Sequence, residues 1–206
     1  MEIKRFNFSG FCANCFAVLE DDSIAVIDPG GVSEELIELI LTKRHRAVLL
    51  THCHFDHIAG VANIAQKTKA EVYISIKDEH GLLGSFYNLS EDFNLTIEPY
   101  FNAKTFDDGD IITVGTLKFK VLSTPGHTAG SVCFLIDKFM FSGDTLFRGA
   151  VGRTDLLGGD SLVLKQSLEK LKSIGTDYKV FCGHGEDTTL FYEQNNNLFL
   201  KDNHGF

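Results

Sequence analysis

The sequence predicts an α/β fold, specifically an αββα sandwich in which two mixed β-sheets pack together and helices cover both outer sides. Two observations lead to this prediction. Apolar runs of strand length alternate with helical segments in the first half of the chain, and a second set of strands with its own long helix occupies the second half. The 206 residues contain no low-complexity linker, so we expect a single domain over residues 1–206.

The first half of the chain alternates between strands and helices. Ser33 is a suitable N-cap, and apolar residues at helical spacing follow it as far as Leu41. A second helical pattern begins at Ile58. Four short apolar runs predict strands around these helices, at residues 15–19, 24–27, 47–50 and 72–76.

The second half repeats this combination of strands and helix. A helix is expected from Ser161, ending by Gly175, and the tail after residue 185 has room for one further helix at most. Four apolar runs predict the strands, at residues 117–122, 131–136, 139–141 and 180–182.

Residues 81–110 are the least regular part of the chain, because aromatic residues are mixed there with polar ones. A loop of this length inside a compact domain is commonly a functional loop or lid. An unrecognised helix and turn that packs its aromatic side chains into the core is an equally good interpretation.

Charge and apolar content exclude several classes of function. With 19 Lys and Arg against 28 Asp and Glu, the net charge is −9, and the one dense basic cluster, residues 43–46, stands at an expected helix C-terminus. We therefore expect no nucleic acid partner. No apolar run approaches the ~18 residues of a membrane span, and no signal sequence follows the charged N-terminus. Five irregularly spaced cysteines also favour a reducing compartment, so we expect a cytoplasmic protein.

The segment from Thr51 to His57 carries the strongest chemical signal. His52 and His54 stand two residues apart, so in an extended chain both imidazoles point to the same side. Asp56 and His57 follow at the start of the expected helix and point elsewhere. Two pairs of donors suit two neighbouring metal ions better than one.

Further candidate ligands stand in turns that follow strands. His127 lies in Pro-Gly-His-Thr and His184 in Gly-His-Gly, where the glycines would permit close approach to an ion. Asp144 follows the strand Phe-Met-Phe-Ser-Gly, and a carboxylate can span two ions. The remaining histidines lie in polar surroundings and are expected at the surface: His45, His80 and His204.

Taken together, the motifs His-x-His-x-Asp-His, Pro-Gly-His-Thr-x-Gly-Ser, Ser-Gly-Asp-Thr-Leu-Phe and Gly-His-Gly resemble the metallo-β-lactamase-fold hydrolases. Within that superfamily the chain is most similar to the glyoxalase II group, the hydroxyacylglutathione hydrolases, in the short form without a C-terminal helical domain. The resemblance implies the αββα fold and two divalent metal ions per chain, zinc first, with iron or manganese as alternatives. It also implies the ligands, with His52, His54 and His127 on one ion, Asp56, His57 and His184 on the other, and Asp144 bridging both.

The resemblance also implies thioester hydrolysis, by a hydroxide that the two ions would activate, with Asp56 and Asp144 as catalytic carboxylates. The ions would leave the site positive, which favours an anionic small molecule, and by the resemblance this would be S-(2-hydroxyacyl)glutathione. By the resemblance Arg153 would contact the glutathione portion, although an ion pair that braces its own loop is an equally good interpretation. We expect a monomer or a small homo-oligomer.

Two other functions fit parts of the sequence. The persulfide dioxygenases share much of the motif set but use a single iron held by two His and one Asp, at positions matching His52, His127 and Asp144, and would act on glutathione persulfide. The pair Cys12 and Cys15 could mark a thiol or zinc module, but a single Cys-x-x-Cys is more often a pair of buried strand-edge cysteines.

Overall fold

The first sheet forms from the N-terminal half of the chain. The computed structural model describes residues 1–8, 10 and 13–201. The sheet is mixed, because its first three strands pair antiparallel as a β-meander and its last four strands pair in parallel. Its strands lie side by side in chain order: β1 (Glu2–Asn7), β2 (Asn14–Glu20), β3 (Ser23–Ile27), β4 (His45–Leu49), β5 (Glu71–Ser75) and β6 (Lys104–Phe106).

The second sheet forms from the C-terminal half and is also mixed. Only β10 and β13 pair in parallel, and the other neighbours are antiparallel. A separate small hairpin joins β11 (Leu146–Phe147) to β12 (Ala150–Val151). The order across the sheet is β14 (Thr188–Thr189), β13 (Lys179–Cys182), β10 (Phe139–Gly143), β9 (Val132–Ile136), β8 (Leu117–Ser123) and β7 (Ile111–Val114).

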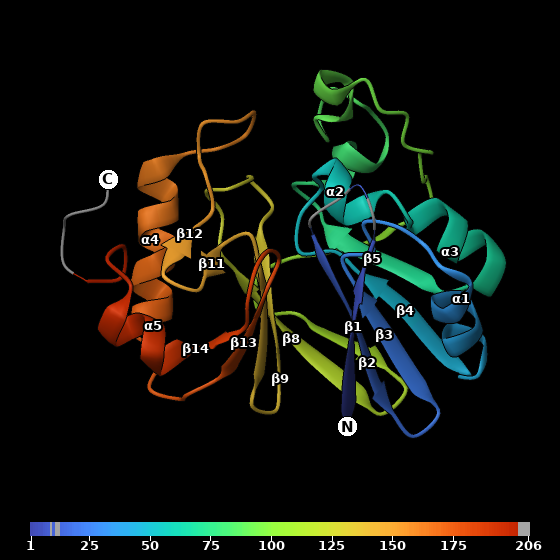
Figure 1. The fold of residues 1–206 in the computed structure, drawn as a ribbon, viewed down its shortest axis with the longest axis horizontal. Helices are drawn as coiled ribbons and strands as arrows, with labels where there is room; N and C mark the ends of the chain where they lie inside the picture. Colours follow the sequence, from blue (N-terminus) through green and yellow to red (C-terminus); the bar gives the residue numbers. More distant parts are fainter. Residues whose placement is uncertain (9, 11–12, 202–206) are drawn as a thin grey trace.

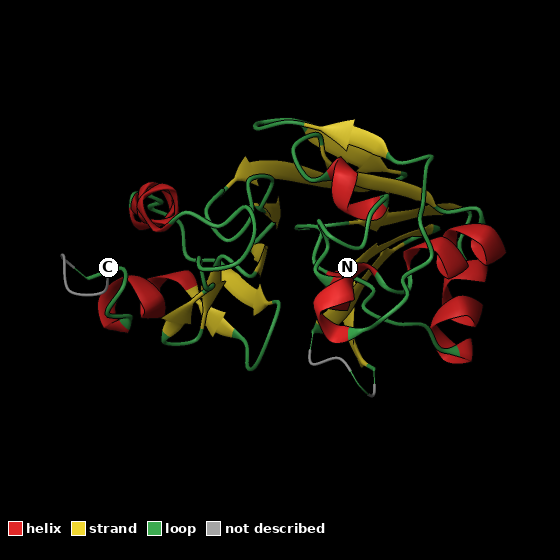
Figure 2. Ribbon diagram, turned by 90° about the horizontal axis from the view of Figure 1, so that it is seen from above, coloured by secondary structure: helices red, strands yellow, loops and turns green. Residues whose placement is uncertain are grey.

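Helices cover the outer face of each sheet, as Figures 1 and 2 show. The first sheet is covered by α1 (Glu34–Leu41) and α3 (Val61–Thr68), and the second by α4 (Ser161–Lys172) and α5 (Leu190–Asn196). This arrangement confirms the predicted αββα sandwich.

The alternation of side chains along the strands produces three apolar layers. In β3, Ile24 and Val26 pack toward α1 and α3, whereas Ala25 and Ile27 face the opposite sheet. Both faces of this strand are therefore buried, which explains its continuous apolar run.

Several boundaries differ from the prediction. The helix expected from Ile58 is two helices, a short α2 (Phe55–Ile58) and α3, and α4 ends at Lys172 rather than at Gly175. The predicted Ser33 cap is confirmed, because the Ser33 hydroxyl accepts a hydrogen bond from the Leu36 amide. Six strands were missed, because they alternate charged and apolar residues or span only two to four residues, and four of them are edge strands of the two large sheets. The missed strands are β1, β6, β7, β11, β12 and β14.

The irregular segment contains two 3₁₀ helices, η1 (Glu79–Leu82) and η2 (Ser90–Phe93), before β6. It rises above α2 at the top of Figure 1. Its aromatic side chains differ in burial: Phe86, Phe93 and Phe101 are exposed, whereas Tyr100 packs against the core and Phe106 is buried in it. The interpretation that the aromatic side chains pack into the core is therefore wrong for the three exposed rings and holds for Tyr100 and Phe106. Among the described residues, no helix is long and apolar enough to cross a membrane.

Candidate metal centre

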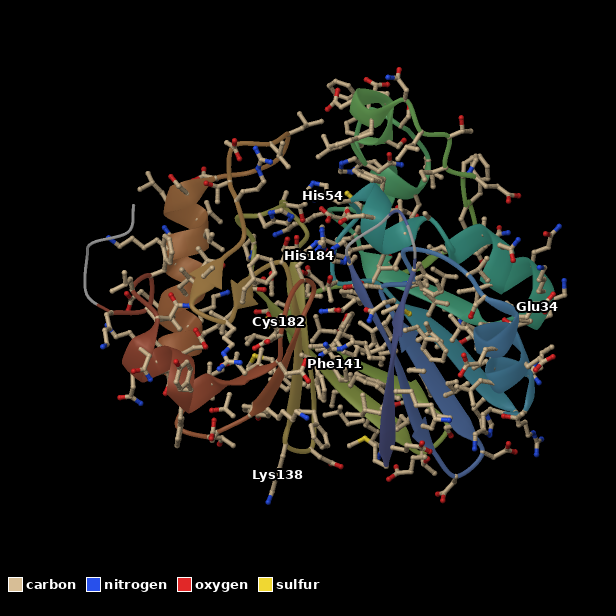
Figure 3. The ribbon with its side chains drawn as sticks, in the orientation of Figure 1. Glu34, His54, Lys138, Phe141, Cys182 and His184 are labelled. Carbon is tan, nitrogen blue, oxygen red and sulfur yellow. The ribbon has the colours of Figure 1, made fainter. Side chains whose placement is uncertain are left out.

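The candidate ligands gather where strands of the two sheets end. His52 follows β4, Asp144 directly follows β10, and His184 stands two residues after β13. Because β10 and β13 are parallel, their carboxyl ends lie at the same edge of the second sheet. Figure 3 shows His54 and His184 close together at this end of the sandwich, with Lys138 at the opposite end.

The first group of ligands, called here the first trio, consists of His52, His54 and His127. One ring nitrogen of each lies within 4.8 Å of the others, and all three side chains are buried. The Nε2 atom of each has no hydrogen-bond partner among the described residues. Because buried polar atoms are normally paired, three converging unpaired nitrogens are what a site for a nitrogen-liganded metal ion requires.

The second trio consists of Asp56, His57 and His184, whose ligand atoms also lie within 4.8 Å of one another. His184 Nε2 is 3.2 Å from Asp56 Oδ2 and 3.3 Å from His57 Nε2. Two imidazoles and a carboxylate form a mixed donor set that suits zinc, iron or manganese.

Asp144 lies between the two trios. Its Oδ2 is 3.5 Å from His127 Nε2 and 3.4 Å from His184 Nε2, and its Oδ1 is 3.3 Å from His57 Nε2. The carboxylate therefore faces members of both trios. The structure brings together all seven residues that the sequence predicted as ligands, and their donor types fit two divalent ions.

The two trios differ in their protonation. Burial, reinforced by the charge of His127, lowers the pKa of His54 to about 3, and burial also lowers that of His52. Burial lowers the pKa of His184 as well, but its hydrogen bonds to the carboxylates of Asp144 and Asp56 outweigh burial and raise the value to about 10. Burial also lowers the pKa of His57, but the negative charges of Asp144 and Asp56 outweigh it and raise that pKa well above its ordinary value.

Metal binding to the metal-stripped protein should therefore release protons from His57 and His184 and none from His52 or His54. A ligating imidazole must be neutral, and His57 and His184 are protonated at neutral pH whereas His52 and His54 are not. Affinity at the second trio should accordingly rise with pH. Calorimetric titration at pH 7 in buffers of different ionisation enthalpy measures this release, and a buffer-independent enthalpy would contradict it.

Asp28 supports the centre, and the sequence analysis missed it. Its Oδ1 accepts a hydrogen bond from the Thr51 amide at 2.8 Å, and its Oδ2 lies 2.6 Å from Thr51 Oγ1 and 3.1 Å from His57 Nδ1. Both carboxylate oxygens are thus engaged, so Asp28 orients His57 rather than serving as a ligand. The signal in the sequence was an Asp directly after a buried strand.

His127 is oriented by a backbone group. Its Nδ1 lies 2.7 Å from the carbonyl oxygen of Arg153, which can only accept. The ring therefore carries a proton on Nδ1, and Nε2 is the nitrogen that faces the other two ligands of the first trio.

Gly126 and Gly183, beside His127 and His184, lie against other parts of the protein. A Cβ at Gly126 would overlap the backbone of Leu164 at the start of α4, and its φ is +133°. A Cβ at Gly183 would lie 2.9 Å from His57 Cε1 and closer still to Asp144 Oδ1. Both glycines make room for neighbouring protein groups, and at Gly183 these groups belong to the candidate centre.

The remaining predicted residues belong to neither trio, and two of them lie outside the described residues. The guanidinium of Arg153 is exposed and forms two 2.7 Å hydrogen bonds with Asp155, as the loop-bracing interpretation requires. His45 and His80 are exposed, as predicted. Cys12 and His204 lie outside the described residues. The other cysteines are buried free thiols, as expected: Cys15, Cys53, Cys133 and Cys182.

Comparison with known proteins identifies the family. A family model for the metallo-beta-lactamase superfamily matches residues 11–184. The chain belongs to this superfamily. This membership supports a hydrolase, and the His and Asp clusters agree with the divalent metals that the superfamily uses.

Individual relatives within the metallo-beta-lactamase superfamily cover almost the whole chain. The chain is 34% identical to the hydroxyacylglutathione hydrolase GloC of Haemophilus influenzae, over 97% of this chain and 98% of that protein. The crystal structure of the BLEG-1 B3 metallo-beta-lactamase matches with a TM-score of 0.88 and 33% identity, over 97% and 100% of the two chains. TTHA1623 in a di-iron-bound form matches with a TM-score of 0.85 and 35% identity, over 96% and 100%.

Proposed function

We propose that the protein is a dinuclear metal-dependent hydrolase that cleaves a thioester, S-(2-hydroxyacyl)glutathione. The observation that carries this proposal is Asp144, which faces a trio of ligands on each side. The likeness to GloC supports the substrate class, and TTHA1623 with two bound irons supports the metal count.

The two trios, Asp144 and Asp56 have different proposed roles at this centre. The two trios would hold divalent ions, whose Lewis acidity would lower the pKa of a nearby water and polarise a carbonyl group. Asp144 lies between the two trios, and Asp56 completes the second trio with its Oδ2 3.2 Å from His184 Nε2, so these two are the proposed catalytic carboxylates. Two divalent ions outweigh these two carboxylates, so the site favours an anionic substrate although the whole chain carries −9.

Arg153 is our candidate for the substrate contact. Its backbone carbonyl orients His127, while its side chain points into solvent with 61% of its surface exposed. An anionic substrate could displace Asp155 from the guanidinium, since Arg binds carboxylates through two parallel hydrogen bonds.

Replacing Arg153 by alanine should raise KM by about tenfold and change kcat less, because a charge-assisted hydrogen bond to the substrate would be lost while the carbonyl that orients His127 remains. Steady-state kinetics on the thioester measure the two constants. An Asp155→Ala variant is the matched control, since it breaks the same ion pair but keeps the guanidinium. An unchanged KM in the Arg153 variant would favour loop bracing.

The deciding experiment measures hydrolysis of S-lactoylglutathione by protein loaded in turn with zinc, iron or manganese, with bound metal counted per chain. We expect turnover with two metals bound. Because BLEG-1 is a B3 metallo-beta-lactamase, a chromogenic cephalosporin is the comparison substrate. Two bound metals without thioester turnover would contradict the glutathione carrier. One bound iron with oxygen consumption on glutathione persulfide would establish the dioxygenase instead.

A further inference from the structure

The buried carboxylate of Asp78 belongs to neither trio, but it connects the two chain segments that carry the ligands of the first trio. Asp78 stands directly before η1, and 1% of its surface is exposed. Its Oδ1 accepts a hydrogen bond from the Gly130 amide at 2.8 Å. Its Oδ2 accepts hydrogen bonds from the Cys53 amide at 3.1 Å and from Thr128 Oγ1 at 2.7 Å.

The partners of Asp78 place it between the ligand segments. Cys53 lies between His52 and His54, and Thr128 directly follows His127. One side chain thus ties together two segments that are more than 70 residues apart in sequence and that supply all three ligands of the first trio.

The contact between Asp78 and the loop after His127 is tight. A Cβ at Gly130 would lie 2.5 Å from Asp78 Cγ, so the carboxylate and this backbone approach each other only because position 130 is glycine. Among the described residues, the side-chain hydrogen bonds of Asp78 reach the segment around Cys53 and the loop around Thr128. None of them reaches a ligand of the second trio or a residue adjacent to one.

We propose that Asp78 is a positioning residue that fixes His52 and His54 relative to His127 and so sets the metal affinity of the first trio but not of the second. This inference rests on the proposed dinuclear centre. Partners behind the ligands of metal sites typically change metal affinity by about 10–100-fold when they are removed.

An Asp78→Asn substitution tests this role with little change in shape. Asparagine has one acceptor oxygen where the carboxylate has two, so its amide group must face a donor on one of the two ligand segments. His52 and His54 should therefore be held less firmly relative to His127, even though the side chain at position 78 keeps the same size.

The variant should be made in two backgrounds, and zinc affinity measured by competition with a chromogenic chelator. In a His184→Ala background the first trio is complete, and Asp78→Asn should lower affinity by about tenfold or more. In a His127→Ala background the second trio is complete, and the affinity should stay within about twofold. Because general loosening of the fold would weaken both sites, this selectivity separates a positioning role from a merely structural one.

Glu193→Gln is the matched control. Glu193 is also fully buried and accepts three hydrogen bonds, from the Gly149 amide, Thr188 Oγ1 and Asn197 Nδ2, but none comes from a segment that carries the first trio. This control should lower the melting temperature and leave zinc affinity unchanged in both backgrounds.

Equal losses in the two backgrounds, or no loss in either, would overturn the role of Asp78. If Asp78→Asn does not fold, Thr128→Val removes one of the three hydrogen bonds and should give a smaller loss confined to the first trio. An unchanged affinity in that variant would overturn the inference. Wild-type protein that binds no zinc would instead overturn the dinuclear proposal itself, and this inference with it.

Discussion

Replacing Asp144 by alanine is expected to remove at least one of the two metal ions and to lower kcat/KM for the thioester by more than about 100-fold. The carboxylate faces His57, His127 and His184, so its loss removes a negative charge from both trios at once. Loss of a group behind a ligand typically costs up to about 100-fold, and a group placed to serve two ions should cost more. Metal counting and steady-state kinetics on the same preparation measure both effects.

A suitable control is Asp187→Ala, because Asp187 forms ion pairs with Arg5 and Lys179 and is not part of either trio. That variant should retain two metals and nearly full activity. An Asp144→Ala protein that is active and fully loaded would show that the carboxylate does not bridge, and the centre would have to be assigned to the two trios alone.

The grouping of the seven candidate ligands could be predicted from the sequence because their signal is local. His52 and His54 are two residues apart on an extended segment, and strands followed directly by Gly-Asp or Gly-His bring Asp144 and His184 to the edge where parallel strands end. The layers could be predicted for the same reason, since apolar runs and helical spacing are properties of short windows.

The supporting residues could not be predicted because their role depends on contacts that are distant in the sequence. Asp28 and Asp78 each follow a strand, as many turn residues do, and only the fold places their carboxylates against Thr51 and Cys53. Edge strands such as β1 were missed on similar grounds, because pairing with β2, rather than an apolar pattern of its own, makes that segment a strand.

The Gly183→Ala substitution is expected to disrupt the centre almost as strongly as the loss of Asp144, although it removes no ligand. The added methyl group would lie 2.9 Å from His57 Cε1 and closer still to Asp144 Oδ1, so the carboxylate, the ring or the backbone must move. Overpacking of this kind costs about 1–3 kcal/mol of stability, and a displacement of about 1 Å at reacting groups can cost about 100-fold in rate. We therefore expect a lower melting temperature, fewer than two metals per chain and kcat/KM reduced by about 100-fold.

Gly175→Ala separates this steric effect from the general cost of replacing a glycine. A Cβ at Gly175 meets nothing within 4 Å, and its φ is not in the left-handed region, so that variant should keep its stability within about 0.5 kcal/mol and bind two metals. Normal metal content and activity in Gly183→Ala would mean that the loop after β13 can retreat from Asp144 and His57. His184, one residue further on, would then move with it, so retention of the second metal is the most sensitive measure of whether this loop is held in place.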